Sequence, residues 1–142
     1  MGRKTQGDMQ YPEELQQLAA ADERVRLFSS PYFANDEFQV YLNAADVASL
    51  PFSEVLTSGS AITALGFGKP MVLPKLGCLP ELIDEEIGVL YDANDDQGLD
   101  RALVEIRQMD LPAAERAARA RAESSDWARA ARIAAVYRGE GA

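Results

Sequence analysis

The chain has 142 residues, of which 47% are hydrophobic and 26% charged, as in an ordinary globular domain. The 14 basic and 23 acidic residues give a formal net charge of −9, which argues against nucleic-acid binding through phosphate neutralisation. The sequence has no histidine and a single cysteine, which excludes a zinc cluster, a cysteine–histidine pair and a serine–histidine triad.

Cellular location is indicated by what the sequence lacks. The N-terminal run MGRKTQGDMQ is polar, unlike a signal peptide, and no apolar run approaches the ~18 residues of a membrane span. We therefore expect a cytoplasmic protein. Residues 111–142 form an arginine-rich tail, which could lie over the acidic segment 81–110 or over anionic lipid. A membrane surface is the less favoured partner, because the tail lacks a clear lysine-rich amphipathic face.

Helices and strands are predicted to alternate along the chain. Apolar periodicity, proline and capping residues give the following elements. In chain order they are a helix from Tyr11, a strand over 24–30, a helix from Asn35 or Asp36 to Ala45, a strand over 46–51, a helix over 58–66, a strand over 70–74, a short helix over 79–83, a strand over 88–92, and helices over 96–109, over 111–123 and from about Ser125. This order predicts an α/β fold with a parallel sheet and flanking helices.

Small hydroxyl residues and glycine make up the segment Thr57-Ser58-Gly59-Ser60, which begins the predicted helix after the strand over 46–51 and its loop. Ligands of an open parallel sheet bind beyond the carboxyl ends of its strands, and the free amides at a helix N-terminus attract anions. Ordinary capping by Ser58 and phosphate binding explain this segment equally well. Glu54, on the same loop, could accept hydrogen bonds from sugar hydroxyls.

Two other charged residues have simpler interpretations. Lys69 follows a predicted helix end and is expected to be a solvated charge. Glu81 lies in the first turn of the predicted helix over 79–83, where it is either a favourable helix-dipole charge or a ligand residue.

Several spaced motifs occur in a familiar order. They are Ala45-Asp46-Val47, Leu50-Pro51, the segment from Ala64 to Pro70, and the segment from Gly77 to Ile83. From about Arg24 to its end, the chain resembles the donor-binding half of retaining glycosyltransferases of the GT-B fold, family 4 (glycosyl transferases group 1). The tail SSDWARAARIAAVYRG, with Trp127 and Tyr137, resembles the closing helix of that family.

The resemblance implies a Rossmann-like domain that binds a nucleotide-sugar donor as substrate. It implies diphosphate contacts from Thr57, Ser58, Gly59 and Ser60, a donor-sugar contact from Glu54, a ribose contact from Thr63, and a base pocket near Ser30 to Tyr32. The family commonly carries two glutamates in this region. Glu54 lies one residue from the first position, and Thr63 occupies the second. We assign no catalytic residue, no metal ligand and no cofactor.

The resemblance also implies that residues 1–142 are a partial donor-binding domain, with C-terminal helices at about 112–139. The acceptor side would come from a missing N-terminal glycosyltransferase domain. We therefore expect an expressed fragment or a truncated gene product that is inactive alone. The alternative is a non-catalytic interaction module that forms homo-oligomers, because a cut sheet exposes a strand edge and apolar surface.

Overall fold

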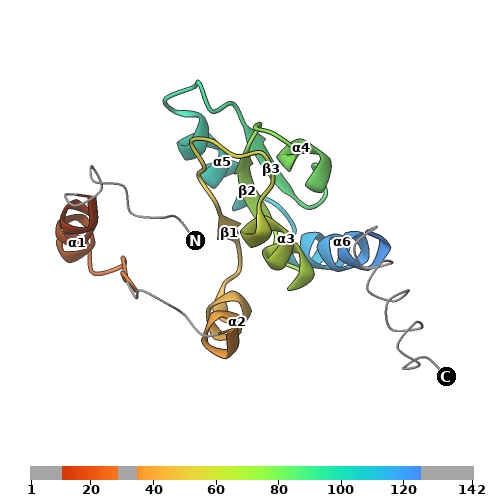
Figure 1. The fold of residues 1–142 in the computed structure, drawn as a ribbon, viewed down its shortest axis with the longest axis horizontal. Coiled ribbons are helices and arrows are strands. Elements are labelled where there is room, and N and C mark those ends of the chain that lie inside the picture. Colours follow the sequence, from red (N-terminus) through yellow and green to blue (C-terminus); the bar gives the residue numbers. More distant parts are fainter. Residues whose placement is uncertain (1–10, 29–34, 126–142) are drawn as a thin grey trace. The chain divides into compact units, whose positions relative to one another are not determined.

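The computed structural model describes residues 11–28 and 35–125 (Figure 1). The chain divides into two compact units, Met1–Ala34 and Asn35–Ala142, and each is described by itself. No helix among the described residues has the length and apolarity needed to cross a membrane.

In the first unit, helix α1 (Tyr11–Ala21) begins where the sequence predicts it, with Glu13 and Glu14 in its first turn. The strand predicted over 24–30 is wrong for residues 24–28, which form no strand. The Asp22 carboxylate accepts hydrogen bonds from the backbone and side chain of Arg24, and the Val25 amide donates to the Asp22 carbonyl oxygen at 2.9 Å. These bonds turn the chain, and residues 29 and 30 lie outside the described range.

The second unit contains a parallel sheet with flanking helices (Figure 1). Its elements in chain order are α2 (Asn35–Ala44), β1 (Ala48–Ser49), α3 (Gly59–Gly66), β2 (Met71–Pro74), α4 (Leu79–Leu82), β3 (Gly88–Tyr91), α5 (Gly98–Ile106) and α6 (Leu111–Ser124). The strands lie in the order β1-β2-β3, and both neighbouring pairs are parallel. The predicted α/β Rossmann-like fold is confirmed.

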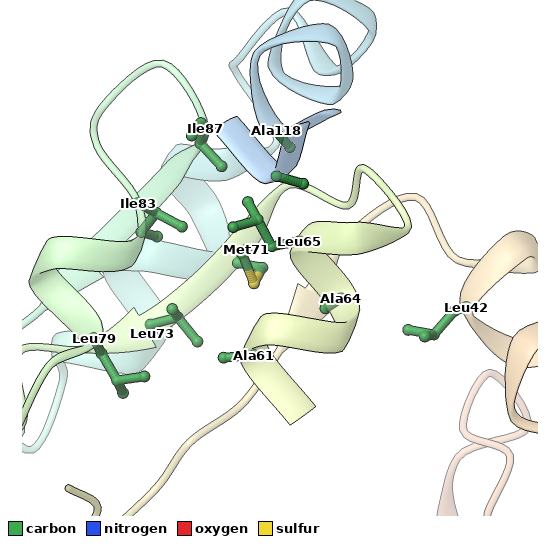
Figure 2. Close-up of a cluster of buried hydrophobic side chains, with 11 residues drawn as sticks. Leu42, Ala61, Ala64, Leu65, Met71, Leu73, Leu79, Ile83, Ile87 and Ala118 are labelled. Carbon is green, nitrogen blue, oxygen red and sulfur yellow. The ribbon is translucent and has the colours of Figure 1, made fainter. Parts of the chain in front are cut away.

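Strand β2 lies at the centre of the sheet and is buried along its whole length. Met71 and Leu73 belong to a core cluster with residues of α3, α4 and α6, whereas Val72 packs with Val89 and with residues of α5. Figure 2 shows Met71 beside Leu65 of α3, and Leu73 between Leu79 of α4 and Ala61 of α3. Because successive side chains point to opposite faces, β2 is covered on both faces, as its apolar sequence predicts.

Small side chains join α3 to α6. Ala61 and Ala64 on α3 belong to the same core cluster as Ala118 and Ala122 on α6, and all four are buried. We call this contact the α3–α6 seam. Alanine at these positions allows the two helices to approach closely, so part of the small-residue pattern of α3 has a packing cause.

The observed boundaries differ from the predicted ones mainly at β1, which has two residues. Hydrogen bonds from the amide of Ala48 to the Pro70 carbonyl oxygen and from that of Leu50 to the Val72 carbonyl oxygen continue the pairing to either side. Helix α6 forms the first part of the C-terminal helices expected over about 112–139. The last predicted helix, with Trp127 and Tyr137, lies outside the described residues.

Candidate functional site

Two loops form a rim at the carboxyl ends of β1 and β2. The first runs from Leu50 to Ser58 and the second from Lys75 to Cys78. The Cys78 amide donates a hydrogen bond to the Leu56 carbonyl oxygen at 3.0 Å. At Gly77, φ is +51°, and an added Cβ would lie 2.4 Å from the carbonyl oxygen of Val55. Glycine therefore lets the two loops touch, which fixes the approach of the first loop to α3.

Ser58 is the N-cap of α3. Its backbone is extended, and its hydroxyl oxygen accepts a hydrogen bond from the Ala61 amide at 3.1 Å. The side chain is among the buried polar groups, with the residue 8% exposed. Capping is thus shown, and it leaves the hydroxyl proton of Ser58 available, because a serine hydroxyl can both accept and donate.

The first turn of α3 presents backbone amides to the rim. The amides of Gly59 and Ser60 have no acceptor within the helix, as in any first turn. Gly59 is exposed, and a Cβ added there would meet no atom within 4 Å. Its φ is not positive, so backbone strain is not the reason for glycine here. The local geometry leaves the backbone open to an approaching group.

The other predicted site residues lie around this turn. Thr57, Ser60 and Glu54 are exposed, and Thr63 is half-buried. The Thr63 hydroxyl donates a hydrogen bond to the Gly59 carbonyl oxygen at 2.7 Å. The structure thus links Ser58 to Ala61 and Gly59 to Thr63, whereas Glu54 lies on the loop that precedes the helix. The predicted base pocket at Ser30 to Tyr32 lies outside the described residues.

The side chains of Glu54, Thr57 and Ser60 at the rim are exposed, as is Gly59. Hollows of about 330 and 370 Å³ lie elsewhere in the second unit, on the outer side of α5 and between α6 and the loop that follows α4. Glu81 is exposed in the first turn of the four-residue helix α4. A phosphate on the amides of α3 would therefore lie against exposed residues of the rim, which favours weak binding by this turn.

The interpretation of Lys69 as a solvated charge is wrong. Lys69 is 5% exposed, and its Nζ lies 3.5 Å from Oε1 of Glu115 on α6. The neighbouring Gly68 has φ +71°, and an added Cβ would lie 2.5 Å from Cγ of Arg119. Lys69 directly precedes the apolar run of β2, and that adjacency was the available signal for its burial. The ion pair of Lys69 and Glu115 attaches the chain at the end of α3 to α6.

Comparison with known proteins gives a family and a fold. The family model described as glycosyl transferases group 1 matches residues 4–108. Among solved structures, a sucrose-phosphate synthase from Thermosynechococcus elongatus matches with a TM-score of 0.74 and 24% identity. The match covers 96% of this chain and 35% of that one, so this chain spans about a third of the solved protein's length. Among curated proteins, none matches.

Proposed function

Because this chain belongs to the glycosyl transferases group 1 family, we propose that it is the donor-binding portion of a retaining glycosyltransferase. Its fold is that of part of a GT-B domain. The observation that carries the proposal is the start of α3, where a capped helix presents the open amides of Gly59 and Ser60 at the carboxyl rim of the sheet.

The diphosphate of a nucleotide sugar is the proposed ligand of this turn. Two backbone amides and the positive end of the helix dipole favour an anion. The hydroxyls of Thr57, Ser58 and Ser60 add donors. Each such hydrogen bond to a charged group contributes about 1.5–3 kcal/mol when it is well formed. These groups would also stabilise the charge that develops on the diphosphate when the sugar departs.

Glu54 and Thr63 are assigned to the rest of the donor. Glu54 is exposed beside the turn, and its carboxylate can accept hydrogen bonds from sugar hydroxyls. The proton of the Thr63 hydroxyl is already donated to the Gly59 carbonyl oxygen. Thr63 would therefore act toward a ribose hydroxyl as an acceptor. An acceptor substrate would be bound by a separate N-terminal domain, so we expect this chain alone to transfer no sugar.

The test is a titration of the whole chain with UDP, GDP and ADP and with their sugar-bearing forms, followed by backbone amide chemical shifts. We expect the amides of Gly59, Ser60 and Ala61 to move at millimolar concentrations, which correspond to a binding free energy of about −4 kcal/mol. If all three nucleotides and their sugars leave these amides unmoved, donor binding by this turn is wrong.

Matched variants separate the proposed diphosphate contact of Gly59 from the proposed sugar contact of Glu54. Gly59→Ala should weaken nucleotide binding because its methyl group faces the ligand, while the free energy of unfolding stays equal or rises by about 0.4–1 kcal/mol. Gly66→Ala, at the other end of the same helix, is the control, since its Cβ would also meet nothing within 4 Å. Glu54→Gln should spare the free nucleotide and weaken the sugar-bearing form. Equal affinities in both glycine variants would contradict the proposed contact.

A second candidate function is self-association as a non-catalytic module. It is favoured by β1, which pairs with β2 on one side and has no strand on its outer side among the described residues. An unpaired strand edge offers its backbone groups to another chain.

A further inference from the structure

Strand β3 forms the other edge of the sheet, and its backbone has a definite orientation. The Lys75 amide donates to the Tyr91 carbonyl oxygen at 2.8 Å, so the backbone groups of Tyr91 face β2. In a parallel pair, alternate residues direct both groups toward the same neighbour. The amide and carbonyl of Leu90 therefore face the outer edge. No strand of the described residues pairs with that edge.

Two adjoining hollows follow this edge. They have volumes of about 210 and 280 Å³. Val89, Leu90 and Glu105 line both of them, so the hollows meet at β3 and form one groove. Since the groove runs along a strand with outward backbone groups, its shape suits an extended peptide, which could add to the sheet as a further strand.

Charge identifies the kind of peptide. The groove is lined by two cations, Lys75 and Arg101, and by five carboxylates, those of Asp84, Glu85, Asp92, Asp95 and Glu105. Two of the carboxylates already have cationic partners, because Asp95 contacts Arg101 and Asp84 contacts Arg121. The other three carboxylates, those of Glu85, Asp92 and Glu105, outnumber the one remaining cation, Lys75, so the groove is acidic.

We propose that the outer edge of β3 is a docking surface for an extended, basic peptide segment of another protein. The bound segment would exchange backbone hydrogen bonds with Leu90, while arginine or lysine side chains at alternate positions would face the carboxylates of the groove. A second copy of this chain carries a net charge of −9, which opposes its approach to the groove, and the experiment below distinguishes it from a basic peptide. The proposal is independent of donor binding at α3.

The experiment adds a short blocked peptide of alternating arginine and valine residues to the whole chain. At saturation, solvent exchange of the Leu90 amide should slow by about tenfold or more, while the Val89 and Tyr91 amides, which face β2, keep their rates. A peptide in which glutamate replaces arginine should not bind. Unchanged exchange at Leu90, or equal binding of both peptides, would overturn the proposal.

Charge-reversal variants locate the contact. Glu105→Lys, at an exposed position of the groove, should weaken binding of the arginine peptide by about five-fold. Asp46→Lys reverses an exposed charge just before β1, at the opposite edge of the same sheet, and should leave binding unchanged. Equal weakening by both variants would indicate a general effect of net charge and contradict the proposal. So would protection of Leu90 without peptide that depends on protein concentration, because a second copy would then occupy the edge.

Discussion

Lys69 carries an ammonium group into the α3–α6 seam, where it is almost completely buried. Its partner Glu115 keeps 36% of its side-chain surface exposed. The buried ammonium of Lys69 therefore depends on its partner for charge compensation more than the carboxylate of Glu115 does. If Lys69 were removed, the carboxylate could take up water, but without the Glu115 charge the ammonium would remain buried and uncompensated.

We therefore predict that Glu115→Gln is the more damaging change. It should lower the free energy of unfolding by about 2 kcal/mol, below the usual cost of breaking a fully buried pair because one partner is partly solvated. Lys69→Met keeps the aliphatic stem and should cost about 1 kcal/mol or less. Urea denaturation of the two variants gives the comparison, and a larger loss for Lys69→Met would contradict this unequal dependence.

Local residues were sufficient to predict the start of α3 and insufficient to predict the surroundings of Lys69. Ser58 caps the helix through an amide three residues away, so its role can be inferred from neighbouring sequence. Glu115 belongs to α6 and reaches Lys69 through tertiary packing, which a local pattern does not contain. The function of Glu54 and Thr63 depends on a ligand, and their contacts with it stay predictions.

Among the elements, the C-terminal end of α3 is formed by two glycines with different roles. A Cβ added at Gly66 would meet no atom within 4 Å. Gly68, in contrast, has a left-handed backbone, and a Cβ added there would collide with the side chain of Arg119. The Gly68 amide donates to the Leu65 carbonyl oxygen at 2.8 Å and that of Lys69 to the Ala64 carbonyl oxygen at 3.0 Å. These bonds stop the helix and direct the chain into β2.

This contrast predicts opposite results for the same substitution. Gly68→Ala should destabilise the protein by about 1–2 kcal/mol, the cost of a left-handed conformation for a residue with a Cβ, and the crowding against Arg119 adds to it. Gly66→Ala should be neutral or stabilising. Thermal unfolding of both variants measures the difference, and similar midpoints would show that the backbone at Gly68 relaxes.

The elements also show which patterns could be read from sequence. The run of β2 is apolar throughout and lies between two strands, so its burial was predicted correctly. The run RVRLFSS mixes apolar residues with two arginines and two serines, and residues 24–28, although predicted as a strand, form none. Val25 is 50% exposed. A strand needs a neighbour to pair with, and composition alone does not reveal whether one is present.

At the scale of the whole molecule, the outer side of β1, with which no strand of the described residues pairs, predicts concentration-dependent association. The backbone groups of Ser49 face away from β2, because those of Ala48 and Leu50 bond to it. Ser49→Pro removes the outward amide and should keep the chain monomeric, while Ser49→Ala, the control, should associate like the unmodified chain. Light scattering over a range of protein concentrations tests this. A monomeric unmodified chain at high concentration would contradict self-association.

The order of the strands in the sheet has a consequence for how the chain assembles. Because β1, β2 and β3 are neighbours in sequence as well as in space, their pairing closes short loops, and the entropy lost in each closure is small. The α3–α6 seam closes a longer loop, from Gly66 to Leu111, and this loop contains β2, α4, β3 and α5. We therefore expect the sheet pairings, which close the shorter intervals, to form before the seam that holds α3 against α6.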